Sequence, residues 1–200
     1  MYCVYLEDVL VCCFRNRNYE YLNILCYILY KMAQIIPGVY LGCVNTATNR
    51  KFIIENNINV IYSIITEKEM TDSIEDNNIE KIITNECIVQ LKYNSSDNII
   101  NHNVIWKQYE ITDTNEEQID KYFETIYTDI TGHITAGKNV LVHCKEGISR
   151  SATIIAAFLM QRNKISRKEA IEFISKIKPN IDPNDGFMDK LKSLEYNIQH

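Results

Sequence analysis

The sequence predicts an α/β fold in which a sheet is flanked by helices. Short apolar segments rich in β-branched residues, which suit buried strands, alternate along the chain with segments whose apolar residues recur every three or four positions, as in amphipathic helices. The chain has 200 residues, of which 46% are hydrophobic and 24% are charged. This composition is typical of one globular domain with its own hydrophobic core.

Residues 1–34 are predicted to form an N-terminal appendage to the main domain, which covers residues 35–198. Four apolar residues of the appendage recur at helical spacing: Leu22, Leu25, Ile28 and Leu29. We therefore expect a helix that packs on the main domain, with a membrane or partner role as the alternative. The apolar run 21–36 is shorter than the ~20 residues that a membrane span needs and contains Lys31, so no membrane span is expected.

The first half of the main domain is predicted to begin with a strand, a helix and a second strand. Val39–Leu41 is apolar and follows a Pro-Gly turn signal, Thr46–Glu55 has a helical pattern, and Val60–Ile65 is an apolar run that suits a buried strand. Residues 67–103 are polar, rich in Asn and weakly patterned. They are interpreted as an insertion, either a long surface excursion or an added hairpin.

The pattern becomes regular again with the predicted strand Val104–Ile111. Thr114 and Glu117 have the spacing of a capping box, so a helix is expected to begin there and to end at Gly137. The apolar face of this helix comprises Ile119, Tyr122, Phe123, Ile126 and Ile130. The short β-branched segment Val140–Val142 is then expected to be a central, buried strand.

Three further helices are predicted after this strand. The apolar segment Ser151–Gln161 forms the first of them. Ser166 and Glu169 have the spacing of another capping box, and the helix that they open is expected to end at Pro179. The last helix is predicted to begin near Asn184 and to bury one face in the core.

The charge and the cysteine content exclude several classes of protein. The net charge is −5, whereas a nucleic-acid-binding surface needs clustered Lys and Arg, so no nucleic-acid partner is expected. The seven cysteines include no C-x-x-C pair, which argues against a zinc site or a thioredoxin-like motif. Their odd number and the lack of a secretory signal predict reduced thiols and a cytoplasmic or nuclear location.

The segment His143–Ser151, between the predicted central strand and the next helix, carries the residues expected to perform the chemistry. A loop in this position directs its backbone N–H groups and the positive end of the helix toward one spot, which suits an anion such as phosphate. Cys144 is then expected to be held as a thiolate and to act as a nucleophile. Arg150 is expected to hold two phosphate oxygens with its planar fork of donors, and Gly147 lets the backbone approach the anion.

The remaining residues of this loop are expected to support these roles. Ser151 is expected to help the thiolate leave when a phosphoenzyme is hydrolysed, and His143 to orient the loop through a hydrogen bond. The phosphate is expected to lie against Lys145, Glu146, Gly147, Ile148, Ser149 and Arg150. Lys145 and Glu146 are expected on the rim of the site, where they influence substrate preference.

The pattern His143-Cys144-x-x-Gly147-x-Ser149-Arg150-Ser151 resembles the signature of the dual-specificity phosphatases at every fixed position. Pro37–Gly42 is similar to the opening strand of that family, and Pro183–Phe187, which contains the supporting residue Asn184, is similar to its final-helix motif. The resemblance covers about residues 35–198. It implies the protein tyrosine phosphatase-like fold, with a central mixed sheet, and a shallow pocket that admits phosphotyrosine, phosphoserine and phosphothreonine.

The resemblance also implies that phosphorylated proteins are hydrolysed through a cysteinyl-phosphate intermediate, without a metal or cofactor. The reaction needs an acid that protonates the leaving group, and Asp113 is expected to be this acid. It stands between a predicted strand and a predicted helix, and its surroundings resemble the acid loop of the family. Glu116, Glu117 and Asp120 are the alternative acids, and an aspartate at the start of a helix is also favourable for the helix dipole alone.

Two other functions remain open at this point. Related loops act on phosphoinositides and on the 5′-triphosphate end of RNA, although both substrates favour more basic surroundings than Glu146 and a net charge of −5 provide. A catalytically inactive phospho-binding module is expected to lack the nucleophile, the arginine or the acid, and all three are present. The sequence does not indicate an oligomeric state.

Overall fold

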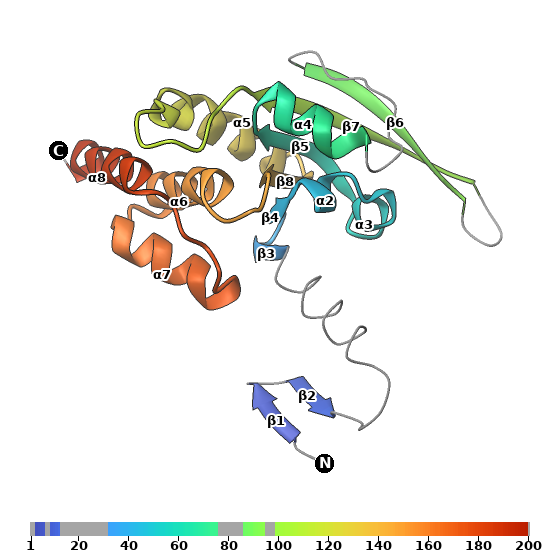
Figure 1. Ribbon diagram of the computed structural model, residues 1–200, viewed down its shortest axis with the longest axis horizontal. Helices are drawn as coiled ribbons and strands as arrows, with labels where there is room; N and C mark the ends of the chain where they lie inside the picture. The colour runs from blue at the N-terminus through green and yellow to red at the C-terminus, as the bar shows by residue number, and fades with distance from the viewer. Residues whose placement is uncertain (1–2, 7–8, 13–31, 76–85, 95–98, 200) are drawn as a thin grey trace. The chain divides into compact units, whose positions relative to one another are not determined.

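The computed structural model describes residues 3–6, 9–12, 32–75, 86–94 and 99–199. The chain divides into two compact units, Met1–Tyr30 and Lys31–His200 (Figure 1). The first unit contains an antiparallel hairpin of β1 (Cys3–Leu6) and β2 (Val9–Cys12). The prediction of a helical appendage is therefore wrong for these two segments, and the helix predicted over residues 22–29 lies outside the described residues.

The second unit is built on a six-stranded mixed sheet with the strand order β3-β4-β8-β5-β7-β6. Its strands are β3 (Ala33–Ile36), β4 (Val39–Cys43), β5 (Ile58–Ile64), β6 (Glu86–Asn94), β7 (Ile99–Tyr109) and β8 (Asn139–Cys144). The four inner strands are parallel, while β3 and β6 are antiparallel to their neighbours at the two edges. This arrangement confirms the predicted mixed sheet and the central position of β8. Because β3 starts at Ala33, the main domain begins before the predicted border at residue 35.

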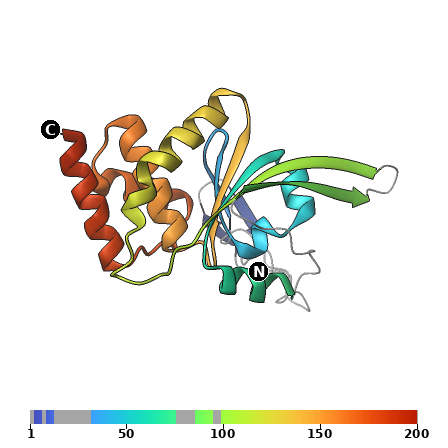
Figure 2. The same ribbon diagram turned by 90° about the horizontal axis from the view of Figure 1, so that it is seen from above.

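Helices cover both faces of this sheet (Figure 2). On one face lie α5 (Phe123–Thr135), α6 (Arg150–Asn163), α7 (Arg167–Ile177) and α8 (Asp185–Gln199), and on the other lie α2 (Val44–Ala47), α3 (Arg50–Glu55) and α4 (Glu67–Glu75). Successive strand residues point to opposite faces. Accordingly, Leu41 and Val142 pack with the first group of helices, whereas Tyr40 and Leu141 pack with the second.

Several helix ends follow the signals predicted from the sequence. Ser166 and Glu169 form the expected capping box at the start of α7, with the Ser166 side chain accepting from the Glu169 backbone N–H and the Glu169 carboxylate accepting from that of Ser166. Asn184 caps α8, because its Oδ1 accepts from the backbone N–H of Phe187 at 2.9 Å. Gly137, with a φ of +73°, follows the end of α5 as predicted.

The helix predicted to begin at Thr114 begins later. The segment that follows Ile111 is irregular and leads into a 3₁₀ turn, η1 (Ile119–Tyr122), before α5. The Glu117 carboxylate accepts from the backbone N–H of Thr112 at 3.1 Å and from its hydroxyl at 2.8 Å. The predicted capping box at Thr114 is therefore wrong: Glu117 stabilises a loop and not the first turn of a helix.

The single helix predicted over residues 46–55 is two short helices. The Asn49 side chain accepts a hydrogen bond from the backbone N–H of Phe52 at 3.0 Å, so it caps α3 and separates it from α2. Short polar side chains favour such positions because they satisfy N–H groups that have no partner in the helix.

Within residues 67–103, the described parts 67–75, 86–94 and 99–103 belong to the main domain and do not form a surface excursion. They contain α4 and all of β6, and β6 pairs with β7 from Glu86 opposite Lys107 to Asn94 opposite Ile99, which confirms the hairpin interpretation. The strand predicted from Val104 therefore starts earlier, at Ile99. Among the helices of the described residues, none has the length and apolar character that a membrane crossing requires.

Candidate active site

The loop between β8 and α6 packs tightly against the end of β4. Gly147 has a φ of +73°, a conformation that favours glycine, and a Cβ atom added to it would lie 2.6 Å from the carbonyl oxygen of Gly42. The backbone N–H of Val44 donates to the carbonyl of Lys145 at 3.1 Å, which ties the loop to the start of α2. The path of the loop is thus set by backbone contacts with the neighbouring strand.

Cys144 lies at the base of this loop and is 1% exposed. Its sulfur accepts two hydrogen bonds, from the backbone N–H of Gly147 at 3.2 Å and from the hydroxyl of Ser151 at 3.2 Å. Both donors favour negative charge on the sulfur. The sulfur is therefore in an environment suited to a thiolate.

Behind the loop, a chain of buried hydrogen bonds connects three strands. The Trp106 indole N–H donates to Ser63 Oγ at 2.7 Å, and Ser63 Oγ lies 2.6 Å from His143 Nε2. On the other side of the ring, His143 Nδ1 lies 3.2 Å from the carbonyl oxygen of Cys144. A carbonyl only accepts, so Nδ1 carries the proton, and the Ser63 hydroxyl donates to Nε2. This network assigns a neutral imidazole that holds the backbone of Cys144.

The surroundings of His143 agree with this tautomer. The side chain is fully buried, and burial lowers its pKa to about 4. The hydrogen bond to Cys144 opposes this shift, and the charge of Arg150 adds a smaller lowering. The ring therefore stays neutral at physiological pH. It has the hydrogen bond to the loop that the sequence analysis expected of it.

Arg150, the first residue of α6, is also buried, with a side chain that is 3% exposed. Its Nη1 donates to the carbonyl of Ile111 at 2.9 Å and to the carboxylate of Glu69 at 2.6 Å, and its Nη2 donates to the other Glu69 oxygen at 3.0 Å. Burial lowers the pKa of Arg150, but Glu69, Cys144 and Asp113 outweigh this effect and raise it above its ordinary value. A permanent positive charge is thus fixed beside the Cys144 sulfur.

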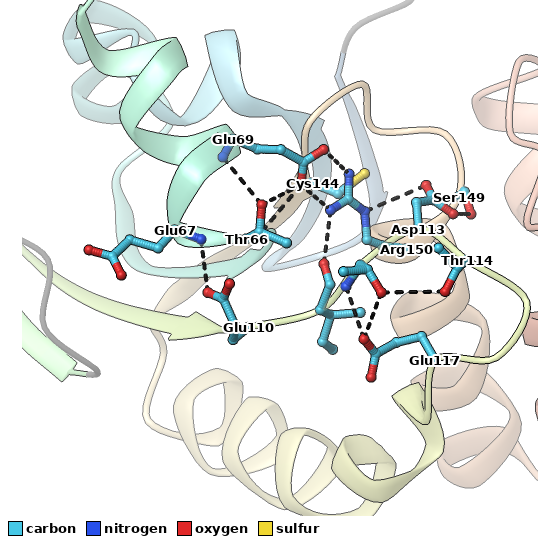
Figure 3. A network of polar contacts seen from close by, with 12 residues as sticks. Thr66, Glu67, Glu69, Glu110, Asp113, Thr114, Glu117, Cys144, Ser149 and Arg150 are labelled. Atoms are coloured by element: carbon cyan, nitrogen blue, oxygen red, sulfur yellow. Dashed lines mark hydrogen bonds and ion pairs between the residues drawn. The ribbon is translucent and has the colours of Figure 1, made fainter.

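Asp113 approaches Arg150 from the side opposite Glu69 (Figure 3). One carboxylate oxygen lies 3.5 Å from Arg150 Nε, and the other accepts from the Ser149 hydroxyl at 2.7 Å and from the Asn184 side-chain amide at 2.9 Å. Its side chain is 34% exposed, so it can reach a bound substrate. Asn184 therefore both caps α8 and holds Asp113.

The loop that carries Asp113 is also anchored through its backbone. Gly186 lies so close to this loop that an added Cβ would be 2.1 Å from the carbonyl oxygen of Asn115. The Gly186 N–H donates to the Asn115 side chain at 3.2 Å. We call this contact between the Asp113 loop and the start of α8 the loop clasp.

Two of the three alternative acids have other partners. Glu117 holds Thr112, and Asp120 pairs with Lys190 at 3.4 Å. Burial raises the pKa of Glu117, but the hydrogen bonds from Thr112 and Gln118 and the charge of Lys121 together outweigh it and hold the pKa below its usual value. Of the four carboxylates considered, Asp113 is the one that approaches Arg150.

The structure brings together most of the residues predicted for the site. Cys144, Arg150 and Asp113 lie close together, with the supporting residues His143, Gly147, Ser149, Ser151 and Asn184 in contact with them or with the loop. Lys145 and Glu146 are exposed, as residues on a rim would be, and Ile148 is half-buried, with its carbonyl accepting from Asp182 at 3.0 Å.

Three side chains in the hydrogen-bond network of the site were not predicted, those of Ser63, Glu69 and Trp106. Glu69 has a local signal, because Thr66 and Glu69 have capping-box spacing. The structure shows this box at the start of α4. Ser63 and Trp106 have no such signal, because the sheet register alone places them beside the loop.

Comparisons with known proteins identify relatives of this arrangement. Dual specificity protein phosphatase 1B of Arabidopsis thaliana is 27% identical over 168 residues, which is 84% of this chain and 84% of that protein. MAP kinase phosphatase with leucine-rich repeats protein 1 of Dictyostelium discoideum is 30% identical over 164 residues, or 82% of this chain, and human dual specificity protein phosphatase 1 is 37% identical over 93 residues, or 46% of this chain. The chain spans only 16% and 25% of the lengths of these last two proteins.

Solved structures agree with these relatives. Human tyrosine phosphatase-like serine/threonine/tyrosine-interacting protein superposes with a TM-score of 0.65 at 25% identity, covering 86% of this chain and 99% of that one. Human DUSP28 has a TM-score of 0.66 at 18% identity, over 84% and 95% of the two chains, and supports the fold alone. The family model of the dual specificity phosphatase catalytic domain matches residues 39–197. As predicted from its sequence, the chain belongs to the dual specificity phosphatases, which hydrolyse phosphorylated tyrosine and serine or threonine residues through a cysteinyl-phosphate intermediate.

Proposed function

We propose that Cys144 is the nucleophile, Arg150 the phosphate clamp and Asp113 the general acid of this phosphatase. The observation that carries the assignment is the pair of hydrogen bonds donated to Cys144 Sγ by Gly147 and Ser151, each at 3.2 Å. A structural core thiol has no need of two donors at its sulfur, whereas a thiolate nucleophile does.

In the first step, the Cys144 thiolate attacks phosphorus, an S–P bond forms, and the bond from phosphorus to the substrate oxygen breaks. Arg150 stabilises the charge on the phosphoryl oxygens during this transfer. Asp113 gives its proton to the departing oxygen, so a neutral alcohol or phenol leaves. The position of Asp113 beside Arg150, with its carboxylate held by Ser149 and Asn184, supports this role.

In the second step, water attacks the phosphorus of the cysteinyl phosphate and the S–P bond breaks. Asp113, now ionised, takes a proton from the attacking water. The sulfur leaves as a thiolate, and its negative charge is stabilised by the hydroxyl of Ser151 and the N–H of Gly147. Inorganic phosphate is released and the resting thiolate is restored.

Phosphoproteins are the substrates that the family implies. The surroundings of the site support them over phosphoinositides or RNA ends, because two carboxylates, Glu69 and Asp113, lie against Arg150 (Figure 3). Polyanionic substrates favour basic surroundings. A reducing compartment, expected from the cysteines, stays a prediction.

The decisive experiment measures phosphate release from phosphotyrosine and phosphothreonine peptides in the presence of EDTA. The wild type is expected to release phosphate from both peptides, and the Cys144→Ser variant from neither. Release by Cys144→Ser at the wild-type rate would contradict the assigned nucleophile. If a folded wild-type protein releases no phosphate but retains the peptides, the site is a binding module.

The general acid is tested by the dependence of the rate on the leaving group. Asp113→Asn is expected to slow the hydrolysis of a phosphothreonine peptide by at least ~100-fold, because an alkoxide leaves poorly without a proton. The loss should be much smaller for p-nitrophenyl phosphate, whose leaving group needs no acid. Equal losses on both substrates would mean that Asp113 has a structural role instead.

A further inference from the structure

The guanidinium group of Arg150 is held by a carboxylate from α4 on the opposite side of the sheet from α6. Glu69 accepts two hydrogen bonds from Arg150, at 2.6 Å from Nη1 and at 3.0 Å from Nη2. The Arg150 side chain is 3% exposed and the Glu69 side chain is 27% exposed, so the pair is largely shielded from water. Glu69 lies 81 positions before Arg150 in the sequence.

The five N–H donors of the guanidinium can be assigned one by one. Nη1 has two, which go to Glu69 and to the carbonyl of Ile111. Nη2 has two, of which one goes to the second oxygen of Glu69. The donor of Nε has no hydrogen-bond partner among the described residues, although the atom is buried; the Asp113 carboxylate lies 3.5 Å away.

The two remaining donors, on Nε and Nη2, lie side by side on one edge of the planar group. This edge is the one that binds two oxygens of a phosphate through parallel hydrogen bonds. Ser151, which follows Arg150 in α6, donates to the Cys144 sulfur at 3.2 Å, so this edge belongs to the same site as the nucleophile. A buried Nε–H without a partner is unfavourable until an anion occupies it.

We propose that Glu69 is a positioning residue, which fixes the Arg150 guanidinium so that the Nε–Nη2 edge faces the substrate phosphate. The inference rests on the proposed function of Arg150 as phosphate clamp. Without Glu69, the long arginine side chain can rotate about its bonds, and it must be ordered again each time phosphate binds. Glu69 thus keeps the guanidinium ordered before phosphate binds.

The Glu69 carboxylate is itself fixed by the first turn of α4. The Thr66 backbone N–H and hydroxyl donate to one of its oxygens, at 3.3 Å and 3.0 Å, and the Thr66 hydroxyl accepts from the Glu69 N–H at 3.2 Å. Partial burial raises the pKa of Glu69, but the hydrogen bonds and charge of Arg150 and the Thr66 donors outweigh it and lower the pKa. Glu69 therefore stays ionised.

Two roles of Glu69 must be separated by experiment: the capping of α4 and the positioning of Arg150. Glu69→Gln keeps the shape and the capping contacts, since glutamine also serves in a capping box, but loses the charge that holds the guanidinium. Glu67→Gln removes an exposed carboxylate from the same helical turn and is the matched control. Thr66→Ala removes the hydroxyl of the cap but keeps the backbone N–H of residue 66 and both hydrogen bonds from Arg150 to the Glu69 carboxylate.

The measurement is the dissociation constant of tungstate, a phosphate-like oxyanion, by isothermal titration calorimetry on the full chain. Glu69→Gln is expected to weaken tungstate binding by about 10-fold, while Glu67→Gln and Thr66→Ala bind it as the wild type does. The kcat/KM for a phosphotyrosine peptide should fall by about 100-fold in Glu69→Gln, because a misplaced arginine also stabilises the transition state poorly. Circular dichroism and Tm verify that each variant is folded.

The inference is overturned if Glu69→Gln binds tungstate as tightly as Glu67→Gln does. It is also overturned if Thr66→Ala weakens tungstate binding as much as Glu69→Gln, since the effect would then come from the helix cap. If Glu69→Gln is unstable, the Thr66→Ala result at a similar Tm still decides between the two roles. A wild type that binds tungstate but releases no phosphate from peptides would contradict the proposed function and leave the tungstate comparison valid.

Discussion

Acidification is predicted to destabilise the folded protein through His143. Burial lowers the pKa of this side chain to about 4 in the folded state, against an ordinary value of 6.5 in an unfolded chain. Between these two values the unfolded chain binds a proton that the folded protein excludes. The stability contributed by the neutral imidazole is thus complete above pH 6.5 and is lost progressively as the pH falls toward 4.

The size of the effect follows from the gap between the two pKa values. From 6.5 to about 4, at about 1.36 kcal/mol for each pH unit, the free energy of unfolding should fall by about 3 kcal/mol on account of His143. Other groups also titrate in this range, among them Glu69 and Glu117, whose pKa values are lowered. The effect of His143 must therefore be isolated by a variant.

His143→Gln is the suitable reference. The Gln amide can still donate toward the carbonyl of Cys144 and accept from Ser63, but it does not titrate. Urea unfolding of both proteins, at several pH values from 7.5 down to 4, gives the free energy of unfolding of each. The difference between wild type and His143→Gln should shift by about 3 kcal/mol across this range, because carboxylates titrate alike in both. Parallel pH dependences would refute a buried neutral histidine.

Three further predictions concern positions around the site. Gly147→Ala should lower kcat/KM for a phosphopeptide by at least ~100-fold, because its φ of +73° and a carbonyl 2.6 Å from the new Cβ force the loop to move; wild-type kinetics would contradict this packing. Asn184→Ala should lose the cap of α8, worth about 1 kcal/mol of unfolding free energy, and also the hydrogen bond to Asp113. Asn184→Asp should keep the cap and the stability but lower kcat, because an aspartate side chain cannot donate to Asp113. Equal stability losses in the two Asn184 variants would disagree with the capping role. Ser63→Ala leaves His143 Nε2 and the Trp106 indole N–H without their partner, which should cost about 1–3 kcal/mol of unfolding free energy for each group, measured by urea unfolding. A loss below about 0.5 kcal/mol would rule out this chain of buried hydrogen bonds.

The sequence was sufficient to predict the regular parts of the domain. The strands β4, β5 and β8 and the helices α6, α7 and α8 were all predicted, because each has a strong apolar pattern or a local cap. For residues 67–103, the sequence could not decide between a surface excursion and a hairpin. The hairpin depends on pairing with the body of the sheet, and pairing across strands leaves little trace in a single polar segment.

The predicted start of α5 at Thr114 was wrong for a related reason. Thr114 and Glu117 satisfy the spacing of a capping box, but Glu117 instead binds Thr112 and stabilises the loop that presents Asp113. Helix propensity and residue spacing describe only local preferences. In a functional loop, the same residues can form loop contacts in place of a helix cap.

The site itself was predicted only as far as its residues are close in sequence. Cys144, Gly147 and Arg150 belong to one loop, so one motif identifies them together. Glu69 and Ser63 lie about 80 positions away and reach the site through the parallel pairing of β5 with β8. No local sequence motif links residues that are so far apart in the chain. The residues that orient the catalytic groups can therefore be identified only from the folded structure.

The loop clasp also determines when a newly synthesised chain can become active. The ribosome makes the Cys144 loop before α8, and α8 supplies Asn184 and Gly186, which hold the Asp113 loop. At about 5–20 residues per second, synthesis from Arg150 to the end of α8 takes roughly 2–10 s. During that interval the nascent chain has its nucleophile but lacks the two contacts from Asn184 and Gly186 that hold the Asp113 loop, so full activity requires translation of the last helix.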